Sequence, residues 1–250
     1  MKFPSLLAPV AAAALLAAGA TQAQQTYKIA YIDPLSGPFA NVGELMLTHT
    51  QYAIEDINAK GGVLGGTRLQ LLQFDSKLSA QESQSALQAA IDQGARAIVT
   101  GGSGSSVVSA LVQAVNRWNQ RNPGKELLVL NHSSIDPELT GKACSFWHFQ
   151  TDANTAMKMK AIANTIKKTP EVKKIYLLNQ DYAHGKQWAS YGRQLVGLAR
   201  PDIQFVGETL HPIGKVKDFA PYLANIKQSG ADSVITGNWG QDMTLLLKAA

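Results

Sequence analysis

The amino-acid sequence predicts an α/β protein made of two doubly wound, Rossmann-like lobes with a ligand cleft between them. Three observations support this fold class. Apolar strands alternate with amphipathic helices along most of the chain. Residues 28–33 and 174–179 are alike, since each is a strand that starts with lysine and leads into a polar loop and a helix. The segment 132–150 interrupts the alternation between them. Helices between strands imply parallel sheets with right-handed crossovers.

In the first lobe, each expected element has a local signal. The first helix has apolar residues at helical spacing and ends at Gly61-Gly62. Ser79 and Glu82 match a capping box at the start of the second helix. The third strand is apolar throughout, which is typical of a strand buried on both faces. We expect strands at residues 27–33, 68–75, 95–100 and 126–131, and helices at residues 43–60, 79–94 and 105–119.

The second lobe is expected to follow a crossing segment at residues 132–150, which contains Pro137, Gly141 and an aromatic cluster. Its three strands are few for a free-standing sheet, and the sequence stops within an amphipathic helix, so we expect a truncated C-terminal part. The expected strands are residues 174–178, 203–210 and 233–237, and the expected helices are residues 154–168, 186–199, 219–228 and the last segment of the chain. The predicted domains are a signal peptide at residues 1–23, an N-terminal lobe at residues 24–145 and an incomplete C-terminal lobe at residues 146–250.

The first 23 residues have the pattern of a secretory signal peptide. Lys2 is followed by an apolar run at residues 6–20 and by small residues before an expected cleavage site after Ala23. The run is shorter than the roughly 20 apolar residues of a membrane span, and Pro9 interrupts it. We therefore expect secretion rather than membrane anchoring.

The composition argues against several classes of function. The formal net charge is +5, and the Lys and Arg residues are scattered, so we expect no nucleic-acid partner. Cys144 is the only cysteine, so no disulfide can form within the chain. The five histidines lie far apart and match no metal-binding motif, so we expect neither a metal nor a cofactor.

A glycine-rich loop at residues 101–106 is the first candidate binding site, because it joins an apolar strand to a helix. Glycine allows close approach of a ligand, and the N–H groups at a helix start attract anions. We therefore expect a carboxylate to bind at Gly104, Ser105 and Ser106. The loop lacks the lysine of a Walker motif, the G-x-G-x-x-G spacing and the G-x-S-x-G pattern of an acyl-transfer elbow. A purely structural glycine turn is the alternative.

Hydroxyl and aromatic side chains follow three other expected strands. Ser133 and Ser134 follow the fourth strand, and Tyr182 and Trp239 follow two strands of the second lobe. Such groups suit a small solute with a carboxylate, an ammonium and an apolar side chain. Packing between the lobes is the alternative for Tyr182 and Trp239. These residues form no nucleophile–base pair, so we expect no catalytic residues and no enzyme activity.

Three segments resemble the leucine/isoleucine/valine-binding family of type I periplasmic substrate-binding proteins, which serve ABC transporters. They are Ser36-Gly37-Pro38, the Asp-Ile-Asn-Ala-Lys-Gly-Gly-Val run at residues 56–63, and the Pro-Glu-Leu-Thr run at residues 137–140. The resemblance extends from about Tyr27 to the end of the chain. It implies that the ligand contacts are Gly104, Ser105, Ser106, Ser133, Ser134, Tyr182 and Trp239.

The sequence departs from this family at two places that bear on the ligand. Val42 occupies the place of a pocket aromatic residue, and the family's ammonium-binding glutamate falls beyond Ala250. The residue that binds an amino group is therefore not identified. Relatives of the family bind amides, urea or aromatic acids in the same cleft.

The resemblance implies a monomeric periplasmic receptor that delivers a small carboxylate-bearing solute to an inner-membrane ABC permease. A branched-chain or other hydrophobic amino acid is the first candidate solute, and an amide, urea or an aromatic acid is the alternative. Two other classes stay open. A transmembrane helix after Ala250 would indicate the extracellular sensing domain of a receptor. Turnover of a bound solute would indicate an enzyme on a Rossmann-like scaffold.

Overall fold

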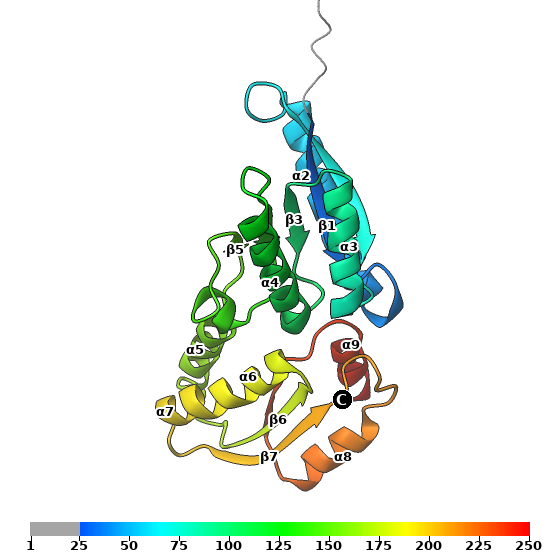
Figure 1. Cartoon of the computed structure of the whole chain (residues 1–250). Coiled ribbons are helices and arrows are strands. Elements are labelled where there is room, and N and C mark those ends of the chain that lie inside the picture. Colours follow the sequence, from blue (N-terminus) through cyan, green and yellow to red (C-terminus); the bar gives the residue numbers. More distant parts are fainter. Residues whose placement is uncertain (1–25) are drawn as a thin grey trace, which may run out of the picture.

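The computed structural model of this chain describes residues 26–250 and has two lobes, each with its own parallel sheet covered by helices (Figure 1). The α/β class and the two-lobe arrangement predicted from the sequence are confirmed. The predicted signal peptide lies outside the described residues. Within the described part, no helix combines the length and the apolar character that a membrane span requires.

The first lobe has a five-stranded sheet in the order β2-β1-β3-β4-β5, and all of its strand pairs are parallel. Its strands are β1 (Thr26–Asp33), β2 (Arg68–Asp75), β3 (Ala97–Thr100), β4 (Leu128–Asn131) and β5 (His148–Gln150). Its helices are η1 (Gly37–Phe39), α2 (Ala40–Ala59), α3 (Ala80–Asp92), α4 (Ser105–Arg121) and η2 (Pro137–Thr140).

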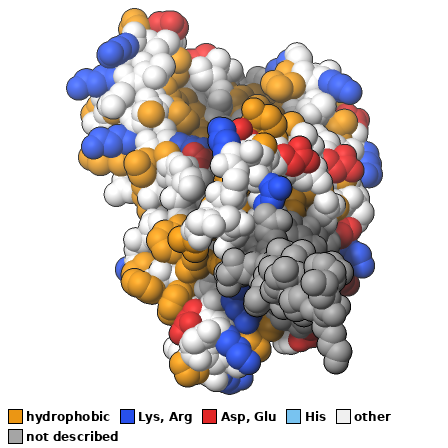
Figure 2. All heavy atoms as spheres, turned by 90° about the horizontal axis from the view of Figure 1, so that it is seen from above, with side chains coloured by type: hydrophobic (Ala, Val, Ile, Leu, Met, Phe, Trp, Pro, Cys, Tyr) orange, Lys and Arg blue, Asp and Glu red, His pale blue; other side chains and the backbone are white. Residues whose placement is uncertain are grey.

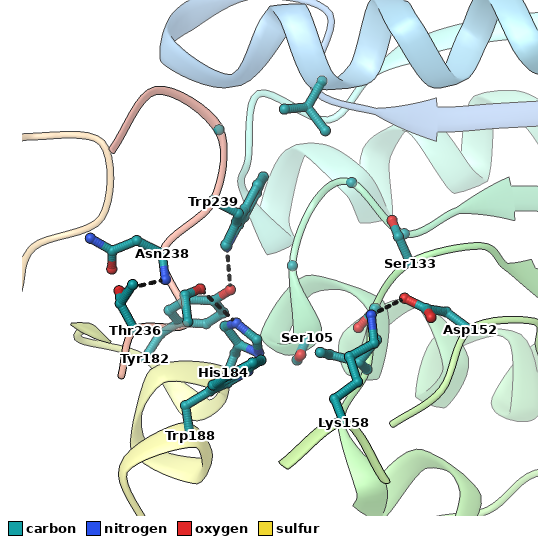
Figure 3. Close-up of a pocket in the computed structure, with 18 of the residues that line it drawn as sticks. Ser105, Ser133, Asp152, Lys158, Tyr182, His184, Trp188, Thr236, Asn238 and Trp239 are labelled. Carbon is teal, nitrogen blue, oxygen red and sulfur yellow. Dashed lines mark hydrogen bonds and ion pairs between the residues drawn. The ribbon is translucent and has the colours of Figure 1, made fainter. Parts of the chain in front are cut away.

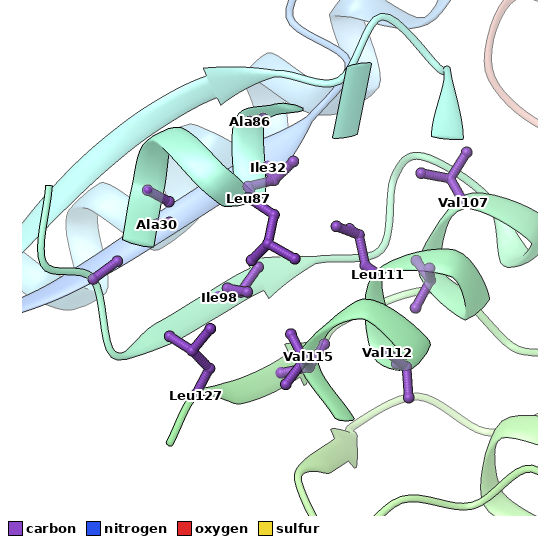
Figure 4. Close-up of a cluster of buried hydrophobic side chains, with 14 of the residues drawn as sticks. Ala30, Ile32, Ala86, Leu87, Ile98, Val107, Leu111, Val112, Val115 and Leu127 are labelled. Carbon is purple, nitrogen blue, oxygen red and sulfur yellow. The ribbon is translucent and has the colours of Figure 1, made fainter. Parts of the chain in front are cut away.

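Alternate residues of the central strands supply two separate apolar clusters, because successive side chains of a strand point to opposite faces. Ala30 and Ile98 belong to the larger cluster, in which Leu111 of α4 is also fully buried (Figure 4). Ile29 packs in a smaller cluster with Ile54 of α2. The sheet is therefore buried on both faces, as its apolar strands indicate.

The second lobe has a three-stranded parallel sheet in the order β7-β6-β8. The helix predicted at residues 186–199 begins three residues earlier and contains a π-helical turn, η3. The elements are α5 (Thr155–Ile166), β6 (Lys174–Gln180), α6 (Ala183–Tyr191), η3 (Gly192–Val196), α7 (Gly197–Ala199), β7 (Gln204–His211), α8 (Ala220–Gln228), β8 (Ser233–Ile235) and α9 (Gly240–Ala249).

The expected crossing segment contains a strand that the sequence pattern did not reveal. Residues 148–150 form β5, which pairs with β4 at the edge of the first sheet. The prediction that places these three residues in the second lobe is wrong, because backbone hydrogen bonds to β4 hold them in the first. A three-residue strand among turn residues is too short to show a period of two. The division of the rest of the chain after residue 145 stays a prediction.

The predicted capping box is half formed. The Ser79 side chain accepts a hydrogen bond from the Glu82 amide at 3.4 Å, as expected of an N-cap. The Glu82 carboxylate lies 3.4 Å from the Lys77 ammonium instead of bonding to the Ser79 amide, which bonds to the carbonyl of Ser76.

On the face seen in Figure 2, basic and acidic side chains are interspersed rather than gathered by sign.

Candidate functional site

A pocket of about 360 Å³ lies between the two lobes, and its walls come from both. Loops after β3 and β4 line it from the first lobe, and the start of α6 and the loop after β8 line it from the second (Figure 3). Ser106 is exposed and is not among the lining residues. The other predicted site residues line the pocket, namely Gly104, Ser105, Ser133, Ser134, Tyr182 and Trp239.

The first part of the glycine-rich loop is held by Asp33, a fully buried residue at the end of β1. Its carboxylate accepts five hydrogen bonds from the loop and its neighbour Thr100. The donors are the amides of Gly101 (3.1 Å), Gly102 (3.0 Å) and Ser103 (3.0 Å) and the hydroxyls of Ser103 (3.0 Å) and Thr100 (3.2 Å). The amides of Gly101, Gly102 and Ser103 therefore already bond to an internal carboxylate and are not free to bind a ligand.

The start of α4 remains available to an anion. The amides of Ser105 and Ser106 are in the first helical turn, where N–H groups have no acceptor within the helix. The helix dipole adds partial positive charge at this end. Gly104 precedes them with φ 81° and ψ 161°, a conformation that is essentially restricted to glycine. The structure thus leaves the amides of Ser105 and Ser106 for an anion, and the exposed Ser106 side chain does not line the pocket.

Ser133 is tied to the same buried carboxylate through a histidine. Its hydroxyl lies 2.9 Å from His132 Nδ1, and His132 Nε2 lies 2.9 Å from Asp33. In a neutral imidazole that donates from Nε2, Nδ1 accepts the hydroxyl proton, which leaves the Ser133 oxygen as an acceptor. Serine, histidine and aspartate also occur together in hydrolases, but here the aspartate organises a loop. The neighbouring Ser134 hydroxyl is buried and has no hydrogen-bond partner within residues 26–250.

Two aromatic residues of the second lobe form the opposite wall. Trp239 Nε1 donates to the Tyr182 hydroxyl oxygen at 2.8 Å, so the phenol hydrogen is free to point elsewhere. Burial raises the pKa of Tyr182, which keeps this group protonated and able to donate. The Trp239 ring lies 4.4 Å from that of Phe39 in the first lobe. Trp239 therefore both packs between the lobes and lines the pocket.

Two charged side chains of the pocket were missed from the sequence. Lys158 Nζ lies 2.6 Å from Asp152 Oδ2, and both side chains are about one-third exposed. Asp152 follows β5, the strand that the sequence did not reveal, and Lys158 is in the first turn of α5. Recognising β5 would have placed Asp152 at the carboxyl end of a parallel strand, where ligands bind in such sheets.

The floor of the pocket contains a buried histidine. His184 Nε2 donates to the carbonyl of Gly237 at 2.9 Å. Burial lowers the pKa of His184 from 6.5 to about 4, because a charged imidazolium is poorly solvated there. The indole nitrogen of Trp188, one turn further along α6, is buried without a hydrogen-bond partner in the described part of the chain. Among residues 26–250, no cluster of three His, Cys, Asp or Glu side chains could hold a metal ion.

The low pKa of His184 predicts a loss of stability in acid. The folded state binds fewer protons at this site than the unfolded state does between pH 6.5 and about 4. The stabilisation is therefore complete above pH 6.5 and is lost as the pH falls toward 4, by on the order of 3 kcal/mol. Urea unfolding at several pH values should show a shallower pH dependence for His184→Gln than for the unmodified chain. Equal slopes would contradict this assignment.

The chain matches the family model described as "Periplasmic binding protein" over residues 26–250. It is 38% identical over 248 residues to the Leu/Ile/Val-binding protein homolog 4 of Brucella abortus, an alignment that covers 98% of this chain and 58% of that relative. It is 22% identical to the Leu/Ile/Val-binding protein of Escherichia coli K12, with 89% of this chain and 57% of that protein covered. The chain thus spans less than two thirds of the length of these relatives.

Solved structures agree in fold. The closed conformation of a leucine-, isoleucine-, valine-, threonine- and alanine-binding protein from Brucella ovis is 35% identical and has a TM-score of 0.76. The match covers 90% of this chain and 57% of that one. A solute-binding protein of an ABC transporter from Rhodopseudomonas palustris, in complex with 3,4-dihydroxybenzoic acid, has a TM-score of 0.77 at 18% identity, over the same shares of the two chains. This second likeness concerns the fold alone.

Proposed function

This chain belongs to the type I periplasmic binding protein family, in its leucine/isoleucine/valine-binding branch, and we propose that its cleft receives a small carboxylate-bearing solute for an ABC importer. The solute carboxylate accepts hydrogen bonds from the amides of Ser105 and Ser106 in the first lobe and from the Tyr182 hydroxyl in the second. The observation that supports this arrangement is the placement of a free helix start and a protonated phenol on opposite walls of one pocket.

The apolar part of the solute contacts the Trp239 ring and aliphatic side chains of the first lobe. Val42 and Met46 of α2 line the pocket there, and Val42 occupies the place where the family resemblance expects an aromatic residue. Aliphatic side chains suit a branched-chain or other hydrophobic amino acid. The Brucella relatives named for amino acids are also more similar in sequence than the Rhodopseudomonas proteins bound to benzoates. An aromatic acid is the second candidate, and an amide or urea the third.

The receptor role implies other properties that we propose with it. They are a location in the periplasm after removal of residues 1–23, an inner-membrane permease as partner, a monomeric state and binding without a covalent step. In the alternative role, the same domain senses a solute outside the cell as part of a receptor. Lobe closure on the solute is the common event of both roles.

Thermal stabilisation by a panel of amino acids, amides, urea and benzoates tests the proposal. A solute at 100 times its Kd adds about 2.7 kcal/mol to the free energy of unfolding. For a chain of this size we expect a rise in Tm of roughly 5–10 °C for the best solute. No shift with any panel member, in protein freed of endogenous solute, would overturn the proposal. Mass spectrometry of the recovered solute should show it chemically unchanged, and a converted product would favour an enzyme instead.

A further inference from the structure

Two charged residues, Lys158 and Asp152, line the cleft, and the role inferred for them here rests on the function proposed above. Lys158 belongs to α5, which is fixed to the second lobe because the adjacent Met159 is fully buried in that lobe's core. Asp152 lies in the connection between β5 of the first sheet and α5. The cation is therefore held on a rigid helix at the boundary of the two lobes.

The ion pair leaves most of the donor capacity of Lys158 unused. An ammonium has three N–H donors, and Asp152 Oδ2 is the acceptor recorded within residues 26–250. A partly exposed pair six residues apart contributes little to stability by itself. Asp152 is thus suited to position the lysine, and Lys158 can bind a second acceptor without leaving its partner.

The pocket that Lys158 lines also contains buried polar groups without hydrogen-bond partners in the described residues. The Ser134 hydroxyl is 2% exposed by residue, lines the same pocket and has no hydrogen-bond partner in the described residues. In Figure 3 the tip of Lys158 lies between Ser105 and Ser133, and all of these residues line one pocket. Buried polar groups without partners indicate a place for a solute's polar end.

We propose that Lys158 is a ligand-binding residue that contacts the solute carboxylate from the second lobe, while the first turn of α4 contacts it from the first. The carboxylate then bridges the lobes, so the lysine selects for acidic solutes and favours the closed state. Asp152 acts as a positioning residue that keeps the Lys158 side chain in the pocket. This assigns a charged contact beyond the seven residues predicted from the sequence.

Calorimetric titration of four variants tests the assignment, with L-leucine and 4-hydroxybenzoate as first probes and the best acid of the panel after them. Loss of a charge-assisted hydrogen bond predicts that Lys158→Met weakens binding of the acid by roughly 10- to 100-fold. Lys158→Arg, which restores the positive charge, should recover at least half of that loss on a logarithmic scale. Lys160→Met is the matched control, because Lys160 is exposed two residues further along the same helix, and it should leave the Kd unchanged.

Asp152→Asn distinguishes the positioning role of Asp152 from the direct contact that Lys158 makes with the solute. It leaves Lys158 charged, so the affinity for the acid should fall by less than about threefold, a smaller loss than for Lys158→Met. Unchanged affinity in Lys158→Met, no recovery in Lys158→Arg, or equal losses in Asp152→Asn and Lys158→Met would each overturn the assignment. If the unmodified protein binds no acid of the panel, the proposed function itself fails, which is a different result from binding that ignores Lys158.

Discussion

Replacing Asp33 by alanine is expected to lower the free energy of unfolding by about 3–5 kcal/mol and to abolish solute binding. The Asp33 carboxylate is fully buried and accepts hydrogen bonds from the amides of Gly101, Gly102 and Ser103. Removing it leaves three buried N–H groups and the His132 ring without their acceptor. The loop then loses the conformation that places the start of α4 at the pocket. Urea unfolding and calorimetric titration measure the two effects.

Asp75 is the matched control for this substitution. It is the last residue of the neighbouring strand β2 and pairs in register with Asp33. However, Asp75 is only partly buried, and its carboxylate accepts hydrogen bonds from the amides of Leu35 (2.9 Å) and Lys77 (2.8 Å). Because water can replace its hydrogen bonds, Asp75→Ala should cost about 1 kcal/mol and leave binding intact. Equal losses for the two variants would contradict the role given to Asp33.

Replacing Gly104 by alanine is expected to weaken solute binding by about 10- to 100-fold and to cost about 1–3 kcal/mol of stability. The φ of 81° with ψ of 161° strains any residue that has a Cβ. A Cβ at this position would also lie 3.4 Å from the Tyr182 ring and 3.8 Å from that of Trp239. Both distances are ordinary van der Waals contacts, so the methyl group would touch both second-lobe rings and leave no room for the walls of the pocket to come closer.

Gly124→Ala separates backbone strain from contact across the cleft. Gly124 has a similar φ of 83°, but nothing lies within 4 Å of a Cβ placed there. Its substitution should lower the stability and leave the Kd unchanged. If Gly104→Ala binds the solute as tightly as Gly124→Ala does, the lobes do not close against this glycine.

Most of the architecture could be predicted because its signals are local. The apolar strand at residues 97–100 and the amphipathic helix after it differ in period, and both appear close to the expected bounds. β5 could not be predicted, because three residues carry no measurable period and the strand depends on pairing with β4. The exposed side of α2 shows the same limit. Ala53 lies at helical spacing from Met46 and Thr50, which predicts a buried residue, yet it is exposed.

The parts of the site that depend on local backbone geometry could be predicted from the sequence. The parts that depend on side chains distant in the sequence could not. A glycine loop before a helix indicates an anion site from sequence alone, and Gly104 and Ser105 do line the pocket. Nothing in the sequence pairs Asp33 with a loop about 70 residues away, so the occupation of the first three amides by its carboxylate was missed. Asp152 was missed with the strand that precedes it.

A crystal structure of the protein with its bound solute tests the central claim, that the two lobes enclose a small acid between them. We predict density for a small molecule whose carboxylate lies within hydrogen-bond distance of the Ser105 and Ser106 amides and of the Tyr182 hydroxyl. A solute bound outside this cleft, or a cleft filled by its own side chains in the stabilised complex, would contradict the account.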